Sequence, residues 1–194
     1  MINDNKILVF GNGGLAKQLD YDILKLKLSP VYYEDNNGIN IKKYKRFILG
    51  ISNPKIRQSI TSKLVKLGLS PYKLISSFAY ISDSCKIEEN VTILRECIIE
   101  PKTNIGYGSL LNLGVYFHHD SACGKFCEIA PRATILGNVS IGDYTFIGSG
   151  AIIKEKTKIG KNCIIGMGSV VIRNIPDGQM WVGNPAKFIK KTEL

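Results

Sequence analysis

The chain has 194 residues, which is enough for one medium-sized domain or two small ones with a buried core. Its formal net charge is +10, but the lysines are scattered over both halves without a dense basic block, so we expect a solvated surface or a polyphosphate ligand rather than a nucleic-acid partner. No stretch approaches the ~20 apolar residues of a membrane span, and the first residues lack the build of a signal peptide, so we expect a soluble cytoplasmic protein with no membrane insertion.

The N-terminal residues follow the pattern of a nucleotide-binding unit. Residues 6–10 predict a buried strand and residues 15–24 a helix. Between them lies the glycine-rich turn Gly11-Asn12-Gly13-Gly14. Strand, glycine turn and helix open a βαβ unit in which the amides at the helix N-terminus receive a phosphate. The turn is only part of a dinucleotide fingerprint, so a glycine-eased turn of an ordinary α/β domain is the alternative.

Two more strands and a second helix extend this region. Residues 30–33 and 46–51 predict strands, and Pro54 predicts the start of a helix that ends near Leu67. Polar residues follow these strands at Glu34, Asp35 and Asn53. The carboxyl ends of parallel strands meet at one edge, where a ribose or a base is bound, although a simple loop is the alternative. We expect residues 1–74 to form a small Rossmann-like α/β domain that holds one nucleotide.

The remainder of the chain has a period of six residues. Every sixth residue from Ile81 to Val171 is apolar without a slip in register, and the fourth residue after each is small or β-branched. This period fits neither an amphipathic helix nor a hairpin strand. It is typical of a hexapeptide solenoid, in which three hexads close a triangular coil and stacked coils bury a continuous column. We expect residues 75–194 to form an all-β parallel β-helix with a C-terminal tail.

The five cysteines fall on positions that packing explains. Cys85, Cys97, Cys127 and Cys163 occupy the small-residue column, and Cys123 occupies the apolar column. A metal pair at Cys123 and Cys127 is the alternative, but the chain has only two histidines to complete such a site. We therefore expect structural cysteines, no disulfide and no metal.

Both histidines, His118 and His119, lie in one turn of a coil and precede Asp120. The turn is outside the packed column, so packing does not require a histidine there, and the acidic neighbour can orient an imidazole. Gly137 follows His119 by one full coil and so lies above it, at the ~4.8 Å spacing of adjacent strands. A general base beside a backbone N–H that can hold an oxyanion is the arrangement that acyl transfer requires.

These motifs together resemble the bacterial nucleotide-sugar N-acetyltransferases that act on 4-amino-dideoxy sugars, a group similar to the sialic acid O-acetyltransferases. The resemblance covers the whole chain, including the C-terminal Val-Gly-Asn-Pro-Ala-Lys segment of residues 182–187. It implies a left-handed β-helix, a homotrimer and acetyl-CoA as the acetyl donor. The implied reaction is acetylation of the amino group of a UDP- or dTDP-linked 4-amino-dideoxy sugar for surface glycan biosynthesis.

The resemblance also implies roles for individual residues. His119 would be the general base, Asp120 its acidic partner and Gly137 a catalytic backbone donor. The substrate-binding positions that it implies are Gly11, Asn12, Gly13, Gly14, Glu34, Asp35, Ser52, Asn53, Asn112 and His118. The positions that it implies for acetyl-CoA are Gly137, Ile147, Gly148, Gly166, Pro185 and Lys187.

Two departures from the family pattern leave the acceptor open. Leu15 stands where a histidine is common, and His118 stands where a glutamate usually precedes the catalytic histidine. One alternative is therefore O-acetylation of a sialic acid or a related sugar. A trimeric carbonic anhydrase on the same scaffold would need three spaced histidines, and a non-catalytic nucleotide-binding scaffold would not need the His118-His119-Asp120 turn.

Overall fold

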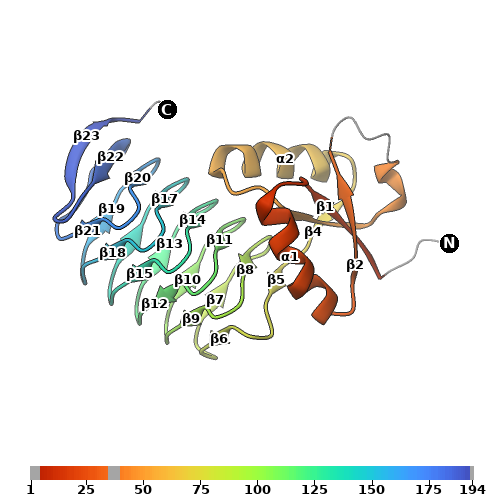
Figure 1. Cartoon of the computed structure of the whole chain (residues 1–194), viewed down its shortest axis with the longest axis horizontal. Coiled ribbons are helices and arrows are strands. Elements are labelled where there is room, and N and C mark those ends of the chain that lie inside the picture. Colours follow the sequence, from red (N-terminus) through yellow and green to blue (C-terminus); the bar gives the residue numbers. More distant parts are fainter. Residues whose placement is uncertain (1–4, 35–39, 193–194) are drawn as a thin grey trace.

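The computed structural model of the chain describes residues 5–34 and 40–192, and these form two parts joined end to end (Figure 1). A small α/β part comes first. A long parallel β-helix follows it and carries a hairpin at its far end.

The α/β part is a four-stranded parallel sheet with the strand order β2-β1-β3-β4. Its elements are β1 (Lys6–Phe10), α1 (Gly14–Lys25), β2 (Ser29–Tyr33), the 3-10 helix η1 (Ile41–Lys43), β3 (Arg46–Leu49), α2 (Pro54–Lys66) and β4 (Ser70–Pro71). The predicted strands and helices are confirmed to within two residues at each end. The short edge strand β4 and helix η1 were not predicted, because neither is long enough to show a hydrophobic period.

The central strand β1 is covered on both faces. Ile7 and Val9 pack in one cluster with residues of α1, and Leu8 and Phe10 pack in another with Leu64 of α2. A strand that is buried on both sides reads as a continuous apolar run, as this one does.

The β-helix has three faces built from two-residue parallel strands. The first face contains β5 (Leu74–Ile75), β8 (Thr92–Ile93), β11 (Leu110–Leu111), β14 (Glu128–Ile129), β17 (Phe146–Ile147) and β20 (Ile164–Ile165). The second face contains β6 (Tyr80–Ile81), β9 (Ile98–Ile99), β12 (Tyr116–Phe117), β15 (Thr134–Ile135), β18 (Ile152–Ile153) and β21 (Val170–Val171). The third face contains β7 (Lys86–Ile87), β10 (Asn104–Ile105), β13 (Ala122–Cys123), β16 (Ser140–Ile141) and β19 (Lys158–Ile159).

The predicted coil and its apolar column are confirmed. Each strand pairs with the strand one coil later, so that Phe117 lies beside Ile135 and Ile135 beside Ile153. The second residue of each strand points inward, and these residues form one continuous core cluster along the β-helix. No single coil could bury such a column, so the stacked coils depend on one another.

The small-residue column does more than fit a tight corner. Its hydroxyl and thiol groups donate hydrogen bonds to backbone carbonyls at the corner of the next coil. Examples are Ser121 Oγ to Leu136 O at 2.8 Å, Thr145 Oγ1 to Gly160 O at 2.8 Å and Cys97 Sγ to Asn112 O at 3.1 Å. All five cysteines are free; four of them lie in the core cluster of the β-helix and Cys85 packs against it, which agrees with their predicted packing positions.

A C-terminal hairpin closes the far end of the first face. Strand β22 (Gln179–Val182) pairs with β20 in parallel and with β23 (Lys187–Lys191) in antiparallel orientation. The Thr192 hydroxyl then donates to the Asn162 carbonyl oxygen at 2.7 Å. The sequence predicted only a tail here, because the hexapeptide period has already ended.

The two parts are held together by a buried arginine. The Arg57 side chain of α2 is fully buried, and its guanidinium donates to Ile51 O at 2.8 Å in the α/β part and to Gly108 O at 3.1 Å in the β-helix. These contacts fix the N-terminal end of α2 against the first face. No helix in the described part of the chain is long and apolar enough to cross a bilayer.

Candidate active site

The predicted nucleotide-binding residues meet at one edge of the sheet. The glycine turn, Glu34 and Ser52-Asn53 follow the adjacent strands β1, β2 and β3 at their carboxyl ends. Gly11 has a φ of +109°, and a Cβ built on it would lie 3.0 Å from Gly50 O, so the crossing of these loops requires glycine. Asp35, which was predicted with them, lies outside the described residues.

The N-terminus of α1 is open to a ligand. Gly13 precedes the helix without a side-chain cap, and a Cβ on Gly13 or Gly14 would meet nothing within 4 Å. Among the described residues, the first amides of the helix therefore lack a capping side chain. A helix start of this kind suits a phosphate group.

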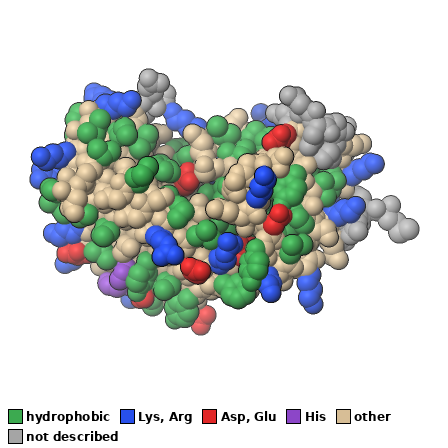
Figure 2. Space-filling model, in the orientation of Figure 1, with side chains coloured by type: hydrophobic (Ala, Val, Ile, Leu, Met, Phe, Trp, Pro, Cys, Tyr) green, Lys and Arg blue, Asp and Glu red, His purple; other side chains and the backbone are tan. Residues whose placement is uncertain are grey.

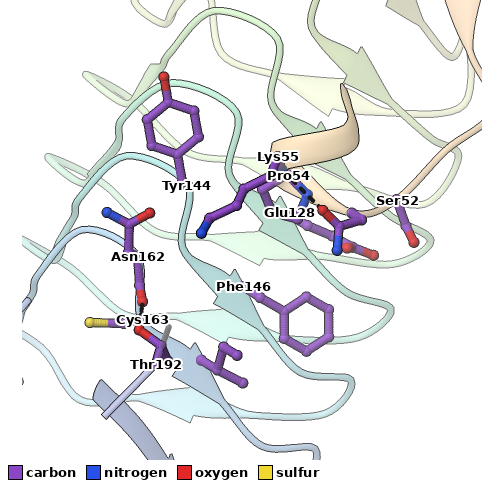
Figure 3. Close-up of a pocket in the computed structure, with 11 residues that line it drawn as sticks. Ser52, Pro54, Lys55, Glu128, Tyr144, Phe146, Asn162, Cys163 and Thr192 are labelled. Atoms are coloured by element: carbon purple, nitrogen blue, oxygen red, sulfur yellow. Dashed lines mark hydrogen bonds between the residues drawn. The ribbon is translucent and has the colours of Figure 1, made fainter. Parts of the chain in front are cut away.

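A cavity of about 310 Å³ continues from this edge onto the β-helix (Figure 3). It lies between the N-terminal end of α2 and the first face, and Thr192 of the C-terminal segment lines its far side. Its lining residues are Ser52, Asn53, Pro54, Lys55, Glu128, Tyr144, Phe146, Asn162, Cys163, Ile164 and Thr192. Asn53 also caps α2, because its side-chain oxygen accepts from Lys55 N at 3.0 Å and Ile56 N at 3.1 Å.

Glu128 is a cavity residue that sequence reasoning missed. It occupies the outward position of β14, yet it is only 6% exposed, because α2 covers this part of the first face. Burial raises the pKa of its carboxyl to about 7, against the opposing effect of Arg57. Burial likewise lowers the pKa of Arg57 to about 10. The sequence did contain a signal for Glu128. It is a carboxylate at an outward-facing strand position of the first face, where the neighbouring coils have Leu110, Phe146 and Ile164.

The histidine turn has the predicted internal geometry. His119 Nδ1 lies 2.8 Å from Asp120 Oδ2, and both side chains are about half exposed. A Cβ built on Gly137 would lie 2.8 Å from His119 Nε2, so the backbone one coil later borders the imidazole directly. Asp120 therefore orients one ring nitrogen, and the other faces Gly137.

The backbone of Gly137 can take part in this site. Its carbonyl accepts a hydrogen bond from Lys156 N at 2.9 Å, whereas no acceptor for its N–H is found among the described residues. A side chain in place of this glycine would collide with the imidazole. An N–H next to a base is suited to stabilise an oxyanion that forms there.

His118 has a different environment from His119. Its ring stacks on Tyr116 with the ring centroids 4.1 Å apart, and the Tyr116 hydroxyl donates to Glu100 Oε1 at 3.0 Å. The half-buried His118 is thus part of an aromatic stack on the second face, while His119 projects from the corner.

The positions expected to bind acetyl-CoA lie around the second face. Gly148 and Gly166 are stacked at the corner before this face, and Gly137 is at the corner after it. Pro185 and Lys187 are exposed in the hairpin segment. Ile147 is fully buried and points into the core, so its side chain is unavailable to a ligand.

In one chain the histidine turn and the cavity do not meet. The cavity lies on the first face, whereas His119 lies at the corner between the second and third faces. In Figure 2 the histidine side chains are at the lower edge, while α2 runs along the upper edge in the same orientation (Figure 1). Asn112 is also remote from His119: it is buried at the corner between the first and second faces, where its Oδ1 accepts from Leu113 N at 2.8 Å.

No group of three or more His, Cys, Asp or Glu side chains within residues 5–34 and 40–192 could hold a metal ion.

Comparison with known proteins places this geometry in a family. The model of the bacterial transferase hexapeptide, described as six repeats, matches residues 120–155 and 138–173. GDP-perosamine N-acetyltransferase of Escherichia coli O157:H7 is 34% identical over 158 residues, which cover 78% of this chain and 70% of that protein. The chain belongs to the bacterial hexapeptide-repeat acetyltransferases.

Solved structures in this family share the whole architecture. PerB from Caulobacter crescentus, in complex with CoA and GDP-perosamine, is 25% identical with a TM-score of 0.90, over 95% of this chain and 97% of that one. The acetyltransferase domain of PglB from Neisseria gonorrhoeae FA1090, in complex with acetyl coenzyme A, is 26% identical with a TM-score of 0.89, over 96% of this chain and all of that one. The resemblance inferred from the sequence motifs is confirmed.

The raised pKa of Glu128 predicts a pH-dependent difference in stability between this acetyltransferase and its Glu128→Gln variant. The unfolded chain releases the Glu128 proton near the ordinary value of 4.5, whereas the folded chain keeps it up to about pH 7. Between these values the folded state binds more protons, so Glu128 lowers the stability of the wild type as the pH rises. The melting temperature of Glu128→Gln should therefore rise relative to that of the wild type as the pH increases from 4.5 to about 7.

The exposed Glu89 provides the control, because Glu89→Gln removes a carboxylate that is 66% exposed. Its melting temperature relative to wild type should change little over the same pH range. An equally flat profile for Glu128→Gln would contradict the raised pKa.

Proposed function

We propose that this chain transfers the acetyl group of acetyl-CoA to the amino group of a nucleotide-linked 4-amino-dideoxy sugar. The observation that carries the proposal is the His119–Asp120 pair directly beneath the Gly137 backbone. The open helix start and polar strand ends of the α/β part supply the nucleotide-binding edge. The named relatives that act on GDP-perosamine or bind CoA support the same substrate classes.

In the proposed reaction, His119 Nε2 removes a proton from the amine as its nitrogen attacks the thioester carbon. A C–N bond forms and the C–S bond breaks, so that CoA leaves as the thiol after taking up the proton. Asp120 holds Nδ1 and stabilises the imidazolium, and the Gly137 N–H stabilises the tetrahedral oxyanion. Acetyl-CoA would lie along the second face, between the Gly148–Gly166 corner and Gly137.

The acceptor would be anchored by its nucleotide. A diphosphate fits the open N-terminus of α1, and the ribose and base fit the strand ends near Glu34. The sequence resemblance implies UDP or dTDP as the carrier, and the relatives that act on GDP-perosamine add GDP as a third carrier to test.

We further propose a homotrimer, in which an acceptor bound by one protomer reaches His119 of its neighbour. The second face offers an apolar surface for this contact, because Ile98 is 39% and Ile152 41% exposed at its outward positions. The third face is unsuited, since Lys86, Ser140 and Lys158 project from it. Contact between copies would cover the apolar face and would bring the acceptor cavity of one protomer close to His119 of the next.

An acetylation assay with a panel of acceptors tests the proposed substrate class. The panel contains UDP-, dTDP- and GDP-linked 4-amino-dideoxy sugars, the free amino sugars and a sialic acid. We expect one nucleotide-linked form to be acetylated on nitrogen with a kcat/KM far above that of its free sugar, because nucleotide binding positions the amine. Equal use of the free sugar, or preferred O-acetylation of the sialic acid, would favour the sialic-acid-type alternative.

Replacement of His119 tests the base. His119→Ala should lower kcat by roughly 10²–10⁴ while leaving acetyl-CoA binding largely intact, because only proton transfer is lost. His118→Ala is the matched control in the same turn and should retain most of the turnover. The opposite pattern in single-turnover kinetics would assign the base to His118.

Light scattering tests the assembly. We expect a particle of about three times the 21.5 kDa chain mass. Ile152→Glu places a charge on the apolar face and should reduce both trimer formation and turnover, whereas Lys158→Glu on the third face should change neither. A stable monomer with full activity would rule out the shared site.

A further inference from the structure

We propose that Glu128 binds the sugar ring of the acceptor, with its carboxylate accepting hydrogen bonds from ring hydroxyls in the cavity between α2 and the first face. This inference rests on the proposed function. It assigns the carbohydrate subsite, which continues from the nucleotide edge at Ser52 and Asn53 and is separate from the histidine turn.

The first argument is the state of the carboxylate. Glu128 is 94% buried, and its side chain has no hydrogen bond or ion pair with any described residue. Buried carboxylates are normally satisfied by donors, because an unpaired one carries a large desolvation cost. Burial raises the pKa of this carboxyl to about 7, against the opposing effect of Arg57, and hydroxyl groups of a ligand would supply the donors that the side chain lacks.

The second argument is direction. Glu128 lies within the cavity wall, and Figure 3 shows its carboxylate extending towards Ser52, with the Phe146 ring on the same side of the cavity. The Lys55 side chain reaches into the space from α2. A carboxylate has two oxygens that can accept from neighbouring hydroxyls at once, and an aromatic ring provides a surface for the apolar edge of a sugar.

The position in the site favours the sugar over the other parts of the acceptor. A diphosphate would be repelled by the carboxylate and is better served by the N-terminus of α1. The base and ribose are expected near Glu34, on the far side of the glycine turn. The reacting amine has to remain free to reach His119 in a neighbouring protomer, so the ring hydroxyls are the donors left for Glu128.

A structural role for Glu128 is the competing explanation. Arg57 is buried nearby, and its Nη2 atom has no hydrogen-bond partner among the described residues, so Glu128 could serve only to balance that charge. No ion pair joins the two groups within the described residues, however, and Arg57 donates instead to the carbonyls of Leu49, Ile51 and Gly108. The two roles predict different losses in Glu128→Gln, which keeps the shape of the side chain and removes its charge.

The experiment measures substrate kinetics and nucleotide affinity on the full-length enzyme. Each nucleotide-linked 4-amino-dideoxy sugar is paired with its bare diphosphate, namely UDP, dTDP or GDP, and both are tested on wild type, Glu128→Gln and the control Glu89→Gln. We expect Glu128→Gln to raise the KM for the amino sugar about 10-fold, because a charge-assisted hydrogen bond becomes a neutral one. The Kd of the bare diphosphate and the KM for acetyl-CoA should stay within twofold of wild type.

Each other outcome overturns the assignment in a different way. An equal loss of affinity for the bare diphosphate would move Glu128 to the nucleotide subsite. Unchanged kinetics with an altered melting temperature would leave only the structural role beside Arg57. If wild type acetylates no nucleotide-linked sugar, the proposed function itself is wrong and the subsite fails with it, whereas an active wild type with an unaffected Glu128→Gln disproves the subsite alone.

Discussion

The parallel register between adjacent coils is the constraint on which the rest of this structure depends. Each residue lies beside its counterpart one coil later, as the pairing of Phe117 with Ile135 shows. This register stacks the apolar column, and it also places Gly137 against the imidazole of His119. Packing and the proposed catalytic geometry are therefore set by the same repeat, and a shift in one coil would disturb both.

A second constraint is the buried Arg57, which joins the two parts of the chain. Its bonds to Ile51 and Gly108 press the N-terminal end of α2 onto the first face. That contact creates the cavity and removes Glu128 from water. A buried guanidinium is costly, as its lowered pKa shows, and the joint has to provide several carbonyl acceptors to hold it.

The three faces of the β-helix differ in surface character. The first face is covered in part by α2 and carries the cavity, the second is partly apolar and is bounded by the glycine corners, and the third is polar. The proposed acceptor and acetyl-CoA surfaces consequently lie on different sides of one chain. In the proposed trimer this division lets each site draw on two protomers.

The sequence by itself determined the coil, the α/β part and the His119–Asp120–Gly137 geometry. These follow from local periodicity and from a fixed repeat, so counting residues is enough to place them in space. It did not reveal Glu128, the Arg57 joint or the C-terminal hairpin. Their surroundings come from segments far apart in the chain: Glu128 sits at a position that is exposed in an isolated coil and becomes buried only when α2 docks on it. Docking between elements depends on side-chain packing in three dimensions, and such packing produces no periodic pattern in the sequence. Only the tertiary structure therefore decided where the cavity lies and which charged side chains it encloses.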